Sequence, residues 1–294
     1  MAGRVNLTQS FLSAGIVMPR NMFSMDVFSM DAKIKDRTTQ VVCVIPARLE
    51  SSRLPRKLLL DAGGKPLIQH AWEAASACPE FSEVVIATDC TEIAAVVERF
   101  GGRAELTRDH SSGTDRIAEV VERCFSNADI VVNLQGDEPE LSSDVVAALV
   151  QTMRRGDAEM ATVAAPLVSA RLIRDPSCVK VVLDQSGNAL YFSRAPIPHS
   201  RDFSIEQILE TVEPTPFLMH VGLYAFRREF LLKLTQMPPS PLEQLEKLEQ
   251  LRALQAGARI AVAVVDHAAA GIDTADDFAA FLARLDHCPE RRAA

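Results

Sequence analysis

The chain has 294 residues, 48% hydrophobic and 24% charged, a composition typical of a globular protein with enough apolar material for a core. Its length exceeds that of the usual single domain, although α/β folds of about 250 residues form one unit. The formal net charge of −8 argues against a nucleic-acid partner or a membrane surface, because proteins that bind these carry basic faces. Any anionic ligand must therefore be met by a local group of cations.

The cysteines are scattered along the chain without a C-x-x-C pair, at positions 43, 78, 90, 124, 178 and 288. Several fall inside apolar runs, which favours buried free thiols over disulfides or a metal site. Free thiols indicate a reducing, cytoplasmic location. No apolar run approaches the roughly 18 residues of a membrane span, so we expect no membrane insertion.

Residues 1–40 are irregular and rich in methionine, without the continuous apolar stretch of a signal peptide. We expect a dispensable N-terminal leader, and Met25 or Met30 is an alternative start that leaves the rest of the chain intact. The periodic part of the sequence covers residues 41–285, and residues 286–294 form a C-terminal tail.

From residue 41 onwards, apolar segments alternate with amphipathic segments. The expected strands cover 41–46, 83–88, 129–134, 160–165, 178–183, 219–226 and 259–265. The expected helices cover 66–77, 91–100, 114–124, 142–154, 241–256 and 274–285. This alternation predicts an α/β fold with a largely parallel sheet covered by helices on both faces. In such sheets ligands bind beyond the carboxyl ends of the strands, so the chemistry is expected in the loops that follow them.

The first of these loops, PARLESSRLPRK, is basic and carries Arg48, Ser51, Arg53 and Lys57. Guanidinium groups bind phosphate oxygens in a bidentate manner and an ammonium group adds a point charge, so the loop fits a polyphosphate. A solvated basic loop is the alternative interpretation. The glycines of a Walker loop are missing, so side chains must hold any phosphate.

Two acidic loops follow later strands. QGDEP leaves Asp137 and Glu138 at the end of the third expected strand, where Gly136 permits a tight turn. In GIDTADD, after the last strand, a helix cap at Thr274 accounts for the acids that follow it but not for Asp273. Mg²⁺ prefers one or two carboxylates and takes its other ligands from phosphate and water. The two loops therefore fit a magnesium site.

A fourth loop, RDHSSGTDR at 108–116, leads into an expected helix. Ser112, Gly113 and Thr114 can begin that helix, and Asp115 fits its first turn. An ordinary helix N-terminus and a ligand-binding loop are equally compatible with this sequence.

Together these segments resemble one family. In chain order stand IPARLESSRLPRK, DAGGKPLIQH, VVIATD, HSSGTDR, VVNLQGDEPE, CVKVVLD, ALYFSRAPIP, HVGLYAF, SPLEQLEKLEQLRAL and GIDTADDF. Over residues 41–285 their order and spacing are similar to those of the 3-deoxy-manno-octulosonate (Kdo) cytidylyltransferases, also called CMP-Kdo synthetases. The resemblance implies a three-layer α/β/α, Rossmann-like fold of the nucleotide-diphospho-sugar transferase type, with a mainly parallel mixed sheet.

The resemblance also implies transfer of CMP from CTP to the anomeric hydroxyl of Kdo, with release of pyrophosphate, which activates Kdo for lipopolysaccharide synthesis. The residues implied as catalytic are Lys57, Arg48, Asp137 and Asp273, and the two aspartates are the implied ligands of Mg²⁺. Those implied for CTP binding are Arg48, Ser51, Arg53, Lys57, Ser112, Gly113 and Gln135.

The sugar side of the implied site consists of Arg194, His220, Tyr224, Glu249 and Gln250. Kdo carries a carboxylate that needs cations and many hydroxyls that need amide and carboxylate partners. Without the resemblance, His220 would be interpreted as a core histidine and Glu249 as part of a solvated helix face. The family also implies a homodimer, formed through a smaller region at about 185–235.

The sequence departs from the family in three places, one of which is Ser111 in HSSGTDR, where glutamine is frequent. Arg56 stands where glycine is common before the lysine, and segment 196–216 is divergent and rich in proline, which leaves sugar specificity and the dimer contact less defined. The alternatives are a CMP-sialic acid synthetase, a sugar-1-phosphate pyrophosphorylase or a non-catalytic nucleotide-binding module. The GxGTRL loop of the pyrophosphorylases is absent, and retention of Lys57, Asp137 and Asp273 argues against a non-catalytic module.

Overall fold

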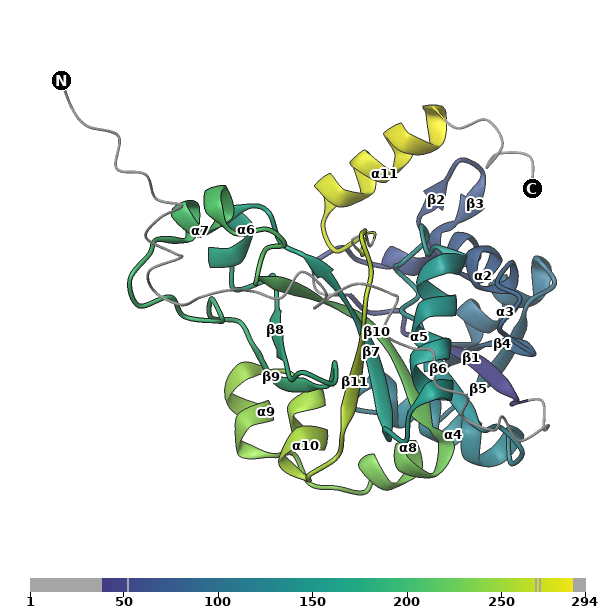
Figure 1. Ribbon diagram of the computed structural model, residues 1–294. Helices are drawn as coiled ribbons and strands as arrows, with labels where there is room; N and C mark the ends of the chain where they lie inside the picture. Colours follow the sequence, from purple (N-terminus) through teal and green to yellow (C-terminus); the bar gives the residue numbers. More distant parts are fainter. Residues whose placement is uncertain (1–38, 52, 268, 270, 288–294) are drawn as a thin grey trace.

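The computed structural model describes residues 39–51, 53–267, 269 and 271–287, and a mixed sheet forms its centre (Figure 1). The strands run in the order β11-β7-β10-β6-β1-β4-β5, and β8 and β9 extend the sheet from β10. Their bounds are β1 (Val41–Ala47), β4 (Glu83–Thr88), β5 (Arg103–Leu106), β6 (Ile130–Asn133), β7 (Met160–Pro166), β8 (Lys180–Leu183), β9 (Ala189–Ser193), β10 (Leu218–Arg227) and β11 (Ile260–Val264).

The core of the sheet is parallel, but β10 runs in the opposite direction to its neighbours. β1 pairs in parallel with β4 and β6, β4 with β5, and β11 with β7. β10 is antiparallel to β6, β7 and β8. The first half of β10 therefore lies at the edge where its parallel neighbours end, and Tyr224 faces Asn133 across the ladder. The predicted mainly parallel mixed sheet is confirmed.

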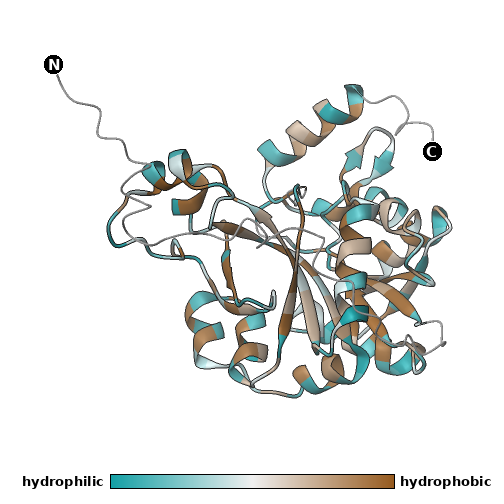
Figure 2. Cartoon of the chain, viewed as in Figure 1, coloured by the Kyte–Doolittle hydropathy of each residue, from teal (hydrophilic) through white to brown (hydrophobic). Residues whose placement is uncertain are grey.

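Helices cover both faces, which gives three layers. One face carries α2 (Leu67–Ser76), α3 (Thr91–Arg99) and α5 (Ser143–Arg155), and the other carries α4 (Gly113–Cys124), α8 (Arg228–Leu234) and α10 (Gln250–Gln255). Successive residues of β1 point to opposite faces, so Cys43 and Ile45 join the first core while Val42 and Val44 join the second. Figure 2 shows the apolar strands between helices whose outer surfaces are polar.

Two smaller groups of elements flank the sheet. The 3₁₀ helix η2 (Lys57–Leu59) precedes the hairpin of β2 (Asp61–Ala62) and β3 (Lys65–Pro66), and the hairpin packs with α11 (Ala275–His287) around Phe281. Opposite α2 and α3 in Figure 1, β8 and β9 carry a lobe that contains α6 (Ala170–Arg174), α7 (Ile205–Thr211) and α9 (Pro241–Glu246).

The prediction of one continuous helix over 241–256 is wrong. The chain forms α9 and α10 with a break at Lys247, whose φ of 54° lies in the left-handed region. The break turns the following residues inwards, so that Leu248 and Gln250 are buried. Strands β5 and β9 and the small hairpin were not predicted, because short and partly exposed strands leave little apolar signal.

The prediction of free thiols is confirmed for the described cysteines, but of these only Cys43 and Cys78 are buried. Cys43, Cys78, Cys90, Cys124 and Cys178 are all free thiols, and burial raises the pKa of Cys43 well above its ordinary value. Cys288 and residues 1–38 of the expected leader lie outside the described residues, whereas Gln40, at the end of that leader, already pairs with Asp129. Among the described helices, none combines the length and the apolar character needed to cross a membrane.

Gly136 lies in the expected turn, where Glu138 N donates to the Gln135 carbonyl at 3.2 Å, and close packing gives a second reason for glycine there. A Cβ atom built on it would lie 2.7 Å from Ile68 Cδ1 and 3.3 Å from Leu58 Cδ2. Both partners are buried side chains of the core. The loop after β6 therefore needs glycine because the backbone approaches its neighbours closely.

We predict that Gly136→Ala lowers the free energy of unfolding by about 1–3 kcal/mol, because the added methyl group overpacks the core. The matched control is Gly156→Ala, since Gly156 has a φ of −114° and the nearest atoms lie 3.8 Å from its built Cβ. Urea denaturation measures both variants. Equal stability of the two variants would contradict the prediction, because it would show that the side chains around Gly136 make room for a methyl group at no cost in stability.

Candidate active site

Two adjoining clefts open at the edge where the parallel strands end. The basic cleft, about 1250 Å³ in volume, is lined by the loop after β1 together with Asp89, Cys90, Asp109, His110 and Arg116. The central cleft, about 920 Å³, lies between the loops after β6 and β11, the first half of β10 and the α9–α10 break. The two clefts share Arg48, Glu50, Ser51, Lys57 and Asp273. They therefore form one continuous site.

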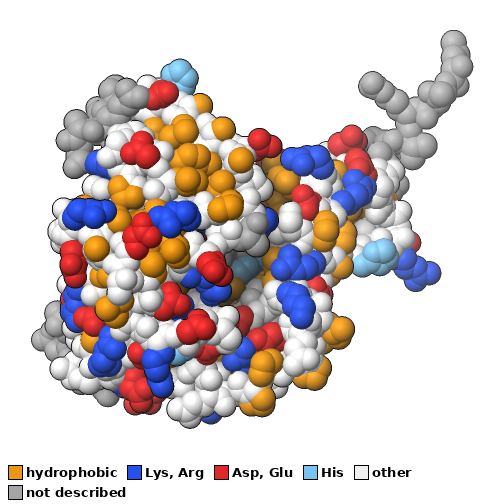
Figure 3. Space-filling view, turned by 180° about the vertical axis from the view of Figure 1, so that it is seen from behind, with side chains coloured by type: hydrophobic (Ala, Val, Ile, Leu, Met, Phe, Trp, Pro, Cys, Tyr) orange, Lys and Arg blue, Asp and Glu red, His pale blue; other side chains and the backbone are white. Residues whose placement is uncertain are grey.

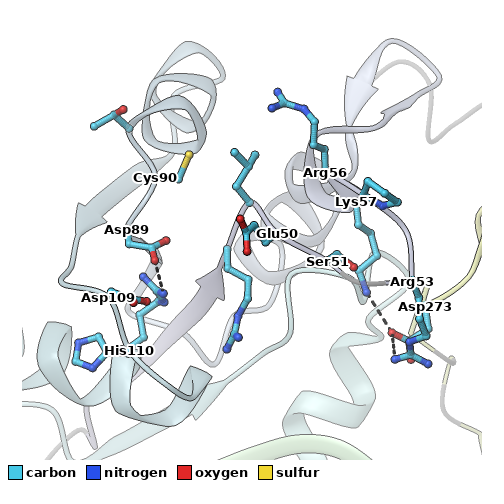
Figure 4. A pocket seen from close by; sticks show the side chains of 15 residues that line it. Glu50, Ser51, Arg53, Arg56, Lys57, Asp89, Cys90, Asp109, His110 and Asp273 are labelled. Carbon is cyan, nitrogen blue, oxygen red and sulfur yellow. Dashed lines mark hydrogen bonds and ion pairs between the residues drawn. The ribbon is translucent and has the colours of Figure 1, made fainter.

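Lys57 lies at the junction of the two clefts and joins loops that are distant in sequence. Its Nζ forms ion pairs with Asp137 Oδ2 and, at 3.2 Å, with Asp273 Oδ1. Arg53 adds a second cation, with its guanidinium 2.9 Å from Asp273 Oδ1 (Figure 4). Most of the Lys57 side chain is buried, so the two carboxylates hold its ammonium group in place. The phosphate-binding and metal-binding residues expected from sequence thus converge on one point.

The donor set at this point fits a hard cation. Both Asp137 and Asp273 contact the same nitrogen, which brings carboxylate oxygens from two strand ends within reach of one small ion. No cluster of three or more histidine, cysteine, aspartate or glutamate side chains suited to a metal was found in the described part of the chain. A Mg²⁺ ion here would take two carboxylates from the protein and its remaining ligands from phosphate and water, which is its usual preference.

Arg56 has a different environment from its basic neighbours. Its side chain is about half exposed, lies at the rim of the basic cleft and forms an ion pair with Glu92 at 2.5 Å. Its φ of 55° lies in the left-handed region that favours glycine, the residue common at this position in the family that the sequence resembles. Figure 4 shows Arg56 turned away from Lys57 and Asp273. Its charge is therefore already balanced outside the junction.

The start of α4 closes one side of the central cleft. Ser112 is the N-cap, its Oγ accepts a hydrogen bond from Asp115 N, and it does not line either cleft. Gly113 does line the central cleft, and a Cβ on it would lie 3.2 Å from Pro46 Cγ. The sequence was equally compatible with a helix N-terminus and with a ligand-binding loop. In the structure Ser112 caps the helix, whereas the next residue, Gly113, lines the cleft.

Gln135 lines the central cleft from the loop after β6, where its Nε2 donates to Asn133 Oδ1 at 3.2 Å. Thr114, which the sequence analysis did not assign to the site, donates a hydrogen bond from Oγ1 to Glu249 Oε2 at 3.0 Å. This bond links the start of α4 to the residues after the α9–α10 break. The signal that marks Thr114 is its place in the SSGTDR segment beside two assigned residues.

Polar atoms at the far end of the central cleft have no partner. Glu249 Oε1 and Gln250 Nε2 are buried without a hydrogen bond among the described residues, and both side chains line the cleft. Burial raises the pKa of the Glu249 carboxyl above its ordinary value. Unsatisfied buried polar groups are unfavourable unless a ligand completes them, so this end is suited to a ligand rich in hydroxyl groups.

Glu138 is a further acid in this cleft. Burial, with a smaller contribution from the neighbouring Asp137 charge, raises the pKa of Glu138 to about 8. It reaches the cleft from the same loop as Asp137, and a Cβ on Gly271 would lie 3.8 Å from its Cγ. A Cβ on Gly222 would lie 3.9 Å from Glu138 Oε1, so the side chain packs against both the loop after β11 and strand β10.

His220 lies in the first half of β10 and Tyr224 in the second, after an irregularity in the ladder, and both line the central cleft. His220 Nε2 is 3.0 Å from Thr162 Oγ1, which also lies within hydrogen-bonding distance of the carbonyls of Val221 and Leu223. Because the threonine has one proton, donated to a carbonyl, the imidazole Nε2–H donates to its oxygen. The His220 ring also contacts that of Tyr224, with centroids 5.4 Å apart.

Arg194 is the one expected sugar residue that lines neither cleft. Its Nε donates to the carbonyl of Glu246 at 2.7 Å and its Nη1 to that of Pro176 at 2.9 Å. Its guanidinium therefore binds backbone next to the site. Arg48, Ser51, His220, Tyr224, Glu249 and Gln250 all line the site where the sequence places them.

The basic cleft contains a buried ion pair that the sequence analysis did not single out. Arg116, almost fully buried, donates to Asp89 Oδ2 at 2.9 Å and to Thr107 Oγ1 at 2.7 Å. These residues follow β4 and β5 and begin α4, so the pair fixes three strand-end segments. A charged residue directly after an apolar strand, as in ATD at 87–89, is the signal that marks such a position.

The surface around the site carries no single basic face in the view from behind. Figure 3 shows Lys and Arg side chains interspersed with Asp and Glu side chains over that face. The cations of the site are concentrated in the loop after β1, in agreement with the expectation that an acidic protein binds an anion through a local group of cations.

Comparisons with known proteins agree with this geometry. The cytidylyltransferase family matches residues 42–260. A 3-deoxy-manno-octulosonate cytidylyltransferase of Rhodopirellula baltica is 49% identical over 245 residues, which are 83% of this chain and 97% of the relative. One of the same name from Syntrophotalea carbinolica is 44% identical over 247 residues, 83% of this chain and 98% of that relative.

Two solved structures are also similar. CMP:2-keto-3-deoxy-manno-octonic acid synthetase complexed with CTP has 43% identity and a TM-score of 0.78 over 85% of this chain and 99% of that one. The 4-diphosphocytidyl-2C-methyl-D-erythritol synthase of Anaerococcus prevotii has 13% identity and a TM-score of 0.56 over 85% of this chain and 100% of that one, which shows likeness of fold alone.

We predict that His220 stays neutral between pH 5 and pH 8. Burial lowers the pKa of His220 to about 3, so protonation is disfavoured in the folded state. In the unfolded chain the pKa of His220 is about 6.5. Below that pH the unfolded state gains a proton that the folded state does not, so the free energy of unfolding decreases as the pH falls from about 6.5 towards 3. Imidazole NMR signals, assigned with His220→Gln, test this. A His220 titration midpoint between pH 6 and 7 would contradict it.

Proposed function

The chain belongs to the cytidylyltransferase family, and from that premise we propose that it transfers CMP from CTP to the anomeric hydroxyl of Kdo and releases pyrophosphate. One observation carries the proposal. A single continuous site has paired cations and carboxylates at the Lys57 junction and unsatisfied buried polar atoms at Glu249 and Gln250. The first end fits a triphosphate and the second a polyhydroxylated acid.

In this reaction the sugar oxygen forms a bond to the α-phosphorus while the bond from that phosphorus to the bridging oxygen of pyrophosphate breaks, and the proton of the sugar hydroxyl is released to solvent. Arg48, Arg53 and Lys57 would bind the phosphate oxygens and offset the charge that gathers on the departing pyrophosphate. Gly113 and Gln135 would hold the nucleoside from the central cleft. Catalysis would rest mainly on positioning and charge, as in other phosphoryl transfers.

We include Mg²⁺ in the proposal, held by Asp137 and Asp273. When bound, the ion would supply positive charge at the α-phosphate and the leaving group. The support is the convergence of the two carboxylates on one ammonium group. Lys57 would then leave one or both carboxylates to bind the phosphates.

We further propose that the protein works in the cytoplasm as a homodimer. The free thiols of the five described cysteines are compatible with a reducing compartment. Two exposed leucines lie on the lobe that β8 and β9 carry. Leu190 of β9 falls inside the expected dimer region, and Leu245 of α9 follows that region in the sequence. Apolar side chains at such positions favour a contact with a second chain.

The test of the proposed function is pyrophosphate release from CTP with Kdo, sialic acid or a sugar 1-phosphate as acceptor. We expect kcat/KM to be highest for Kdo, because a site that pairs a substrate's polar groups rejects poorly matched analogues. With Kdo, CTP should be preferred to ATP, GTP and UTP. Equal or faster turnover of sialic acid would refute the assignment of the acceptor.

We predict that Lys57→Ala lowers kcat/KM by about 10²-fold or more, because Lys57 acts on charge that develops in the transition state. The matched control is Arg56→Gly, which removes the neighbouring cation and suits the left-handed backbone there. We expect the control to stay within about threefold of wild type, since Glu92 already balances Arg56. Similar losses in both would show that the loop acts only as a diffuse positive field.

We predict that Asp137→Asn and Asp273→Asn each lower Mg²⁺-dependent turnover by about 10²-fold or more, because each removes one charge at the junction. Steady-state kinetics over a range of Mg²⁺ concentrations measure the effect, and circular dichroism checks the fold. Near-normal turnover of Asp273→Asn at limiting Mg²⁺ would remove Asp273 from the proposed metal site.

A further inference from the structure

Lys180 is a fully buried lysine at the start of β8, with an exposed fraction of 0%. Its Nζ donates to three backbone carbonyls: Asp175 at 3.0 Å, Cys178 at 2.7 Å and Arg194 at 2.6 Å. An ammonium group has three N–H donors, so all of them are used. No ion pair between Lys180 and a carboxylate occurs among the described residues. A buried cation that binds only backbone fixes where that backbone lies.

The first segment that Lys180 fixes is a wall of the central cleft. Asp175, Ser177, Cys178 and Val179 line this cleft on the side of His220. The hydrogen bonds from Nζ hold the turn at both Asp175 and Cys178. The strand after the turn pairs with β10, where Met219 lies opposite Lys180. Lys180 therefore sets the distance between this wall and the strand that carries His220.

The second segment is reached through Arg194. Lys180 binds the carbonyl of Arg194, and the Arg194 guanidinium binds the carbonyls of Glu246 and Lys247 at 2.7 and 3.4 Å. The Glu246 carboxylate in turn accepts a hydrogen bond from the backbone N–H of Arg194 at 3.0 Å. This places the α9–α10 break, from which Glu249 and Gln250 enter the cleft.

We propose that Lys180 is a positioning residue for the acid sugar: without touching it, the ammonium group fixes both backbone segments that form the sugar side of the central cleft. The inference rests on the proposed function. It predicts a much larger effect on the sugar than on CTP, because the junction at Lys57 shares no contact with Lys180 and the start of α4 is linked to it only indirectly, through Thr114 and Glu249.

The test is steady-state kinetics of Lys180→Met, which keeps the length of the side chain and removes its donors. We expect KM for Kdo to rise about tenfold or more, since small misplacements of binding groups have large effects, while KM for CTP stays within about threefold. The matched control is Arg227→Met, because Arg227 also binds two backbone carbonyls, those of Met153 and Gly156, but lines neither cleft. It should change neither KM.

Wild-type turnover of Kdo is measured first, so a failure of the proposed function is seen before any variant is compared. Equal rises of both KM values in Lys180→Met, no rise in either, or the same Kdo effect in Arg227→Met would overturn the positioning role.

A second measurement does not depend on the variant folding. Amide hydrogen exchange of the wild-type protein is compared with an unreactive CTP analogue alone and with the analogue plus Kdo. We expect Kdo to slow exchange in residues 175–180 and 247–250 beyond the effect of the analogue. Protection of these segments by the analogue alone, or no protection by Kdo, would contradict the proposal.

Discussion

The ammonium group of Lys57, which lies between Asp137 and Asp273, ties together loops separated by 80 and 216 positions in the chain. Two carboxylates brought this close repel one another unless a cation lies between them. The fold supplies that cation from the loop after β1 and the carboxylates from the loops after β6 and β11. This group of ion pairs can form because β1 and β6 are adjacent, parallel strands, so the loops that follow them lie at the same edge of the sheet.

The part of the central cleft proposed to bind the sugar depends on a different constraint, the reversed direction of β10. Because β10 begins where its parallel neighbours end, His220 and Tyr224 reach the same edge as Asp137. The break after α9 brings Glu249 and Gln250 to that edge from the other direction. Both features place polar groups around the central cleft. Two of their buried atoms, Glu249 Oε1 and Gln250 Nε2, have no hydrogen-bond partner among the described residues.

Sequence reasoning predicted the layers of the fold and the residues of the junction well. The apolar period of β1 and the acids that end β6 are local signals, so Lys57 and Asp137 were identifiable from pattern and family resemblance. The break at Lys247 was not, since SPLEQLEKLEQLRAL has a continuous helical pattern and the left-handed residue is held by tertiary contacts from Arg194. Lys180 was likewise hidden, because a lysine in a strand gives no sign that its ammonium group binds three carbonyls.

The most direct test of the Lys57 junction is the affinity of the nucleotide-free protein for Mn²⁺, used as a paramagnetic probe of the carboxylate pair. If Asp137 and Asp273 form one anionic site that Lys57 neutralises, Lys57→Met should bind Mn²⁺ about tenfold or more tightly than wild type, because a close positive charge has been removed. Asp273→Asn introduced into Lys57→Met should abolish the gain. Equal or weaker Mn²⁺ binding by Lys57→Met would contradict a shared site.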